Sequence, residues 1–240
     1  MGIEQKVAVI TGASQGIGAA LVKAYRDRNY RVVATARSVK PLSDADVLVV
    51  PGDIADRKTA ERTISEGMVR FGHIDTLVNN AGIFIAKPFT QYTEADYAAI
   101  LGVNLTGFFN ITQLAIAEME KQGSGHVVQI TTSLVDNAIA GVPSVLASLT
   151  KGGLNAATKS LAIEYAKRGI RVNAVALGII KTPMHSRRDV RAARRLAPAR
   201  AHGRDLRRRR RDSLPRIGQL RDGRDRSCRW RSERRPLTPT

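Results

Sequence analysis

Three glycines stand in the stretch TGASQGIG (residues 11–18), between an apolar run and a predicted helix. Gly12 permits a tight turn, Gly16 lets the backbone approach a pyrophosphate, and Gly18 allows close contact between helix and strand. The free N–H groups at the start of the following helix are suited to an anion. The stretch therefore predicts dinucleotide binding, and the alternative is a turn with a purely structural role.

A second stretch, SVLASLTKGG (144–153), places Lys151 before two glycines at the start of a predicted long helix. One helical turn upstream, on the same face, an acid–base hydroxyl would be most useful, and the chain has Ala147 there. From these residues alone, the stretch is either a catalytic site that lacks one part or a site that was never catalytic.

The elements that must position these residues alternate along the chain. Short β-branched runs, as apolar as strands buried on both faces, occupy residues 6–10, 31–35, 46–50, 75–79, 126–130 and 171–175. Helical stretches lie between them, and in the last of these Leu154, Leu161 and Tyr165 share one face. Six strands with five long crossovers predict an α/β fold: a Rossmann-type doubly wound parallel sheet in a single domain. Ligands of such sheets bind outside the carboxyl ends of the strands.

The end of the second run bears on the choice of cofactor. NAD-preferring sites commonly place an acidic residue there to bind the ribose 2′-hydroxyl, whereas this chain has Ala36, Arg37 and Ser38. A guanidinium matches a 2′-phosphate bidentately, and no carboxylate is present to repel it. Arg37 therefore favours NADP(H) over NAD(H), and the alternative is a solvated loop arginine.

Several motifs together resemble the short-chain dehydrogenase/reductase family. The glycines are spaced GxxxGxG, and the chain continues with NNAG (79–82), Asn104 in VNLTG, Ser133 in ITTS, and Lys151. The resemblance covers about residues 4–185, and GHIDTLVNNAG (72–82) is an especially specific part of it.

The resemblance implies a set of cofactor contacts that runs from the pyrophosphate and adenosine to the nicotinamide ribose and carboxamide. These positions are Gly12, Ser14, Gly16, Ile17, Gly18, Asp53, Asn80, Ala81, Gly82, Lys151, Ile180 and Thr182. Asp53 would reach the adenine amino group, or would instead cap the next helix. Thr182 would hold the carboxamide with Ile180, or would be an ordinary loop hydroxyl. The family's usual Pro-Gly is Leu177-Gly178 here.

The resemblance also implies a catalytic set in which one member is missing. Ser133 would hold the carbonyl oxygen, Lys151 would bind the nicotinamide ribose, and Asn104 would anchor a water relay. The family's proton donor, a tyrosine four residues before the lysine, is replaced by Ala147. Two functions remain open: an oxidoreductase for a small carbonyl or secondary alcohol with a modified proton donor, such as a water held by Ser133 and Lys151, or a non-catalytic NADP(H)-binding scaffold or sensor.

The net charge of +18 is divided unevenly along the 240 residues. Residues 1–185 hold 19 Lys and Arg against 15 Asp and Glu, whereas residues 186–240 hold 20 Arg, no Lys and 6 acidic residues. We therefore expect a boundary near Ser186. It would separate an NAD(P)-binding domain (1–185), incomplete at its C-terminus relative to the family, from an Arg-rich tail (186–240) that would be disordered alone.

Two interpretations of the tail remain open. An arginine-rich arm would bind nucleic acid or acidic membranes through salt-sensitive contacts, which is the less favoured function. The favoured interpretation is a frame-shifted translation of the family's C-terminus, because Gly203–Arg207 and Arg229–Pro236 have synonymous codings that resemble family sequence one base later. The family's C-terminal segment supplies much of the subunit interface, so its loss argues against the homo-oligomer that the resemblance implies.

Other features exclude classes of protein. The single cysteine, Cys228, allows no internal disulfide. We find no uninterrupted apolar run of about 18 residues and predict no membrane span. His73, His126, His185 and His202 are scattered without ligand spacing, so we predict no metal site. No secretory signal or myristoylation motif precedes the first strand, and a cytoplasmic protein is the simplest expectation.

Overall fold

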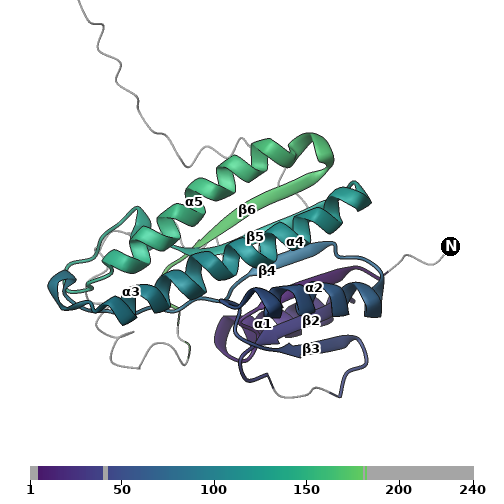
Figure 1. The fold of residues 1–240 in the computed structure, drawn as a ribbon, viewed down its shortest axis with the longest axis horizontal. Helices are drawn as coiled ribbons and strands as arrows, with labels where there is room; N and C mark the ends of the chain where they lie inside the picture. The colour runs from purple at the N-terminus through teal and green to yellow at the C-terminus, as the bar shows by residue number, and fades with distance from the viewer. Residues whose placement is uncertain (1–4, 40–42, 181, 183–240) are drawn as a thin grey trace, which may run out of the picture. The chain divides into compact units, whose positions relative to one another are not determined.

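The computed structural model describes residues 5–39, 43–180 and 182, and these residues form a single parallel sheet with helices on both faces (Figure 1). The strands are β1 (Val7–Thr11), β2 (Arg31–Ala36), β3 (Val47–Pro51), β4 (Thr76–Asn79), β5 (Gly125–Thr132) and β6 (Ile170–Leu177). Their order in the sheet is β3-β2-β1-β4-β5-β6, so the direction of winding reverses between β1 and β4. The predicted α/β doubly wound fold and its six strands are confirmed.

The sheet is buried on both faces because alternate strand residues point to opposite sides. Val7 and Val9 pack toward α2 (Arg57–Phe71), α4 (Gly107–Gln122) and α5 (Val145–Tyr165), and Leu161 and Tyr165 of α5 pack against the same cluster. Ala8 and Ile10 pack instead against α1 (Gly16–Arg26) on the other face. The polar loops at the strand ends are therefore carried on a rigid core.

The prediction of helical crossovers between all strands is wrong for one connection. In the described residues between β2 and β3 there is no helix, because β3 is a short edge strand and about ten extended residues suffice to return along the sheet. The connection from β4 to β5 is more segmented than predicted: it contains the 3₁₀ turn η1 (Phe89–Gln91), α3 (Glu94–Leu101), the π-helical segment η2 (Gly102–Thr106) and α4. Further 3₁₀ turns are η3 (Ser133–Val135) and η4 (Ala166–Arg168).

The continuous helical stretch Glu94–Gln122 is long and apolar enough to cross a membrane by length and composition, with a mean hydropathy of 1.4. Polar residues such as Asn104 and Asn110 interrupt this stretch, so it is not the uninterrupted apolar run by which a membrane span was excluded from the sequence. In the fold, 44% of the most apolar window is buried, and Ile111, Ala115 and Met119 of α4 belong to the core. A core helix of a soluble protein can be equally long and apolar, so this feature is weak evidence for a membrane segment.

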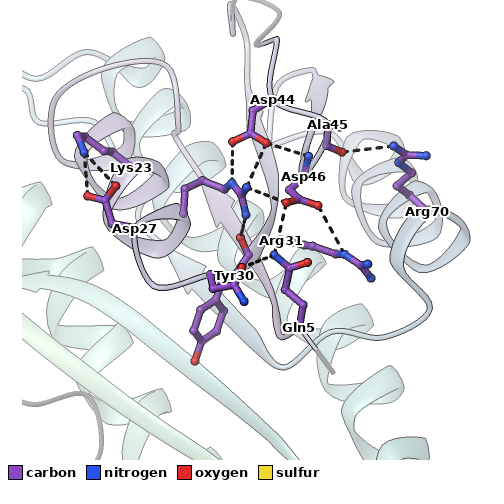
Figure 2. A network of polar contacts seen from close by, with 11 residues as sticks. Gln5, Lys23, Asp27, Tyr30, Arg31, Asp44, Ala45, Asp46 and Arg70 are labelled. Carbon is purple, nitrogen blue, oxygen red and sulfur yellow. Dashed lines mark hydrogen bonds and ion pairs between the residues drawn. The ribbon is translucent and has the colours of Figure 1, made fainter. Parts of the chain in front are cut away.

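A cluster of ion pairs and hydrogen bonds holds the amino-terminal edge of β2 and β3 (Figure 2). Arg26 of α1 contacts Asp44 at 2.7 Å and Asp46 at 2.8 Å, and Arg70 of α2 donates to the carbonyl oxygen of Ala45. This network fixes the end of the connection that begins at Arg37. It lies at the opposite end of the strands from the predicted site.

The predicted domain boundary near Ser186 and the whole Arg-rich tail lie outside the described residues. The same holds for His185, His202 and Cys228. Among the described residues, β6 is one edge of the sheet, and Val175 on this strand is 44% exposed.

Candidate functional site

The first glycine turn is packed so closely that side chains are excluded from it. Gly12 has a φ of +66°, a left-handed conformation that favours glycine, and a Cβ there would lie 2.9 Å from Cα of Ala81. A Cβ on Gly18 would overlap the carbonyl oxygen of Gly12 and lie 2.8 Å from Nδ2 of Asn80. The turn after β1 is therefore pressed against the NNAG segment after β4.

Hydrogen bonds join the same two segments. Oγ1 of Thr11, which is 1% exposed, accepts the backbone N–H groups of Asn80 at 3.0 Å and Ala81 at 2.9 Å. Nδ2 of Asn80 donates back to the carbonyl oxygens of Thr11 at 2.9 Å and Gly12 at 3.2 Å. These reciprocal bonds lock the loops at the point where the winding of the sheet reverses.

The start of α1 fits an anionic ligand. Gln15 precedes the helix and makes no side-chain capping bond, and no acidic residue stands in the first turn. The first N–H groups of a helix lack partners within the helix and carry a positive partial charge. Gly16 and Ile17 are partly exposed there and Ser14 is exposed beside them. The residues present can therefore accommodate a pyrophosphate.

Arg37 and Asp53 follow the ends of the neighbouring strands β2 and β3, and both are exposed. The backbone N–H of Ala13 donates to the carbonyl oxygen of Thr35, which places the glycine turn beside the end of β2. Asp53 accepts from the N–H of Ala55 at 3.0 Å, but the residue that caps α2 is Asp56. The alternative interpretation of Asp53 as the helix cap is thus wrong.

A second part of the site lies where β5 and α5 approach the NNAG segment. Nζ of Lys151 donates to the carbonyl oxygen of Ile130 on β5 at 2.8 Å. A Cβ on Gly82 would lie 3.2 Å from this Nζ and 3.4 Å from Oδ1 of Asn104, so Gly82 lets both side chains approach the same point. Burial lowers the pKa of Lys151 from its usual value to about 8.

Asn104 is held rigidly within the π-helical segment η2 and is 1% exposed. Its Oδ1 accepts the N–H of Ile83 at 2.9 Å, and its Nδ2 donates to the carbonyl oxygen of Ile83 at 3.2 Å and to Oγ1 of Thr150 at 3.1 Å. A π-bulge inside a helix often marks a functional site. Here it ties the loop after β4 to the first turns of α5.

Ala147 lies on the same face of α5 as Lys151 and is 4% exposed. The neighbouring Ser148 donates its hydroxyl to the carbonyl oxygen of Leu134 at 3.2 Å, which joins α5 to η3. Ser133 is the first residue of η3, at the carboxyl end of β5, and is partly exposed. Ile180 and Thr182 follow β6; Ile180 is 41% exposed, and no contact joins either residue to the rest of the site among those described.

The model of the family described as short chain dehydrogenase matches residues 6–192. The chain belongs to this family. It is therefore a member of a class of NAD(P)-dependent oxidoreductases built on a Rossmann fold, as its motifs predicted. Residues 193–240 lie outside the match.

Relatives in the short-chain dehydrogenase family have several substrates. The chain is 37% identical over 196 residues to a 3-oxoacyl-[acyl-carrier-protein] reductase of Thermotoga maritima, covering 77% of this chain and 78% of the relative. It is 36% identical over 186 residues to L-fucose dehydrogenase of Mus musculus, covering 75% of this chain and 67% of the relative.

Solved structures in the family include complexes with both nicotinamide cofactors. A 3-ketoacyl-(acyl-carrier-protein) reductase from Brucella melitensis complexed with NADH has a TM-score of 0.71 and 28% identity, covering 75% of this chain and 78% of that one. The structure of ElxO with NADP bound also has a TM-score of 0.71, with 27% identity and 79% of each chain covered.

Sequence reasoning missed two threonines that organise this short-chain dehydrogenase site. Thr11 precedes the first glycine and Thr150 precedes Lys151, and both hydroxyls bond across elements far apart in the chain. Their positions next to recognised motif residues were the available signal. Threonine is a common residue with many structural uses, so the residue type alone did not indicate that these two positions organise the site.

Proposed function

We propose that the protein is an NADP(H)-dependent oxidoreductase for a small carbonyl or a secondary alcohol, working without the tyrosine of its family. The observation that carries this proposal is the close-packed turn at Gly12 and Gly18, locked to Asn80, with Lys151 and Asn104 meeting at Gly82 beside it. These contacts gather the glycine turn, Asn80, Lys151 and Asn104 at the carboxyl ends of the strands, where sheets of this kind bind their ligands.

In this proposal the residues divide the cofactor between them. Ser14, Gly16 and Ile17 at the start of α1 hold the pyrophosphate with Gly12 and Gly18 beneath it. Asp53 reaches the adenine, and Asn80, Ala81 and Gly82 support the adenosine half. Lys151 binds the nicotinamide ribose, and Ile180 with Thr182 holds the carboxamide.

The preference for NADP(H) rests on Arg37. Its guanidinium is exposed immediately beyond β2, where it is available to a 2′-phosphate, and Ala36 and Ser38 on either side carry no negative charge. The turn that holds the pyrophosphate lies beside the same strand end through the bond from Ala13 to Thr35. The family by itself does not decide the cofactor, since relatives bind NADH or NADP.

Arg37→Glu tests this assignment. We expect the Kd for NADPH to rise about tenfold or more, because a charge-assisted bond contributes about 1.5–3 kcal/mol, while the Kd for NADH changes little. The matched control is Arg28→Glu, which makes the same charge change on an arginine whose guanidinium donates to the carbonyl oxygen of Ala24 in α1. An unchanged ratio of NADPH to NADH affinity in Arg37→Glu would contradict the preference.

The chemistry needs a hydride, which the reduced nicotinamide supplies, and a proton, which the protein must place. Ser133 is positioned at the end of β5 to hold a carbonyl oxygen by its hydroxyl. Lys151 keeps an ammonium group beside the same edge. Ala147 offers no phenol, so a group other than a tyrosine must deliver the proton. Oxidation of NADPH with a panel of small carbonyls tests the activity.

A second function is favoured by Ala147 itself. The loss of the side chain that donates the proton leaves the nucleotide contacts untouched, which suits a protein that binds NADP(H) as a scaffold or sensor. Such a protein would bind NADPH with the same dependence on Arg37 and would transfer no hydride to any carbonyl.

The family implies a nucleotide cofactor and a small-molecule substrate. The single cysteine favours a reducing compartment such as the cytoplasm. A homo-oligomer would follow the family only if the segment beyond Thr182 contributes its share of the interface.

A further inference from the structure

Lys151 stands out among the polar groups of the site because its ammonium is sparsely bonded. It is partly buried and, within the described part of the chain, donates one hydrogen bond, to the carbonyl oxygen of Ile130. An ammonium has three N–H bonds, so two further donors remain. Its Nζ lies close to Gly82 and to the side of the site that Oδ1 of Asn104 also approaches.

Among the described residues, no neighbouring charge holds Lys151 protonated. Burial lowers the pKa of its ammonium to about 8. None of the charged or titratable side chains on the loop after β4 or on the elements packed against α5 contributes: Lys87, Glu94, Asp96, Tyr97, His126, Asp136, Lys167, Arg168 and Arg171. The same is true of Lys159, Glu164 and Tyr165 on α5 itself.

The other hydroxyls near α5 are less suited to donate a proton. Ser148 already donates to the carbonyl oxygen of Leu134, and the phenol of Tyr92 donates to the carbonyl oxygen of Ile85. Ser133 carries a hydroxyl that is much less acidic than an ammonium. A group whose pKa lies near the working pH is the most effective general acid or base.

We propose that Lys151 is itself the proton donor of this site in carbonyl reduction, and the proton acceptor in the reverse reaction. A reduced nicotinamide nucleotide, when bound, would supply a hydride to the carbonyl carbon, and the electron pair of the broken carbon–oxygen π bond would pass to the oxygen. That oxygen takes a proton from the Lys151 ammonium. The resulting neutral amine regains a proton from solvent. This assignment rests on the proposed oxidoreductase function.

The test is the pH dependence of single-turnover reduction by the full chain, measured with saturating NADPH and a panel of small carbonyls between pH 6 and 10. Reduction requires the ammonium, so its rate constant should be level at low pH and fall tenfold per pH unit above about 8. In Lys151→Arg, whose side chain stays charged throughout this range, the break near pH 8 should disappear. Lys159→Arg, on the exposed face of α5, should leave the profile unchanged.

A readout independent of turnover accompanies the kinetics. In protein labelled with [ε-¹³C]lysine, the resonance that is missing from Lys151→Arg identifies Lys151. Its titration midpoint should lie near 8, against about 10.4 for ordinary lysines. The Kd for NADPH, measured by fluorescence in each variant, separates loss of ribose binding from loss of proton transfer.

The outcomes distinguish this proposal from the function on which it rests. A kinetic break that matches the NMR midpoint and is absent from Lys151→Arg supports both. Three results would overturn the role of Lys151 but leave the oxidoreductase standing: a break that persists in Lys151→Arg, a rate that falls steadily from pH 6 as for a solvent donor, or an NMR midpoint near 10. Binding of NADPH without hydride transfer at any pH would overturn both.

Discussion

The two halves of the candidate site are built on different principles. The half around Thr11, Gly12 and Asn80, here called the cofactor half, joins two loops by backbone contacts too close for a Cβ and by reciprocal bonds between side chains and backbone groups. The half at the start of α5 depends on side chains: Lys151 with one bond, Asn104 with three, and Ala147 with none.

This difference bears on the proposal that the chain binds a nucleotide but works without the tyrosine of its family. The backbone cradle of the cofactor half is fixed by the fold, and it is disturbed when a bulky group enters it or when Thr11 or Asn80 loses its hydrogen bonds. A proton donor is one side chain, and none of the contacts of the cofactor half involves position 147. In the proposed function, nucleotide binding and proton transfer are therefore separated at a single residue.

The largest effect is expected from Gly18→Val, which tests the cofactor half. The new Cβ would overlap the carbonyl oxygen of Gly12 and press on Asn80, so we expect loss of NADPH binding together with loss of folded protein. Fluorescence titration and circular dichroism measure the two effects. If Gly18→Val binds NADPH as tightly as the parent chain, the cofactor half does not depend on its close backbone contacts, and the contrast between the two halves is wrong.

The matched control for this prediction is Gly153→Ala in α5. A Cβ there has its nearest neighbour, Cδ2 of Leu105, at 3.9 Å, an ordinary contact. Alanine has a higher helix propensity than glycine, so the free energy of unfolding should rise by up to about 1 kcal/mol. A substitution of glycine that is harmless in one half and destructive in the other is the expected pattern.

A smaller effect is expected from valine at the buried threonine of each half. Thr11→Val leaves the N–H groups of Asn80 and Ala81 without their acceptor, and we expect a loss of about 2–5 kcal/mol in the free energy of unfolding. Thr150→Val removes one of the two bonds of Asn104 Nδ2 and should cost about 1 kcal/mol. Urea unfolding measures both, and equal losses would show that the halves do not differ in this way.

The fold, and the approach of Gly12 to Asn80 and of Lys151 to Gly82, could be predicted from sequence because both depend on local patterns. The apolar runs predicted where all six strands lie, to within a few residues. Gly12 and Gly18 indicated backbone contacts that leave no room for a side chain. The residues at the strand ends then meet because the sheet is parallel.

The hydrogen bonds that complete the site could not be predicted, because they join residues far apart in the chain through ordinary hydroxyl and amide groups. Thr11 bonds to Asn80 and Ala81 about seventy residues away, and Thr150 bonds to Asn104 across the π-helical segment. The lack of a helix in the described residues between β2 and β3 likewise follows from the short edge strand, whose position in the sheet no sequence periodicity reveals. The lowered pKa of Lys151 depends on burial, which becomes known only once the chain is folded.

The most direct test of the central claim, that the cofactor half binds NADPH while the other half works without the tyrosine of its family, is hydride transfer in Ala147→Tyr. With NADPH bound at unchanged affinity, the phenol should raise the single-turnover rate by roughly 10²–10⁴-fold, the usual contribution of a positioned acid. Ala147→Phe, which adds the ring without the hydroxyl, should give no such gain. Tyrosine and phenylalanine variants that are folded, bind NADPH and transfer hydride at the same rate as the parent chain would contradict the claim.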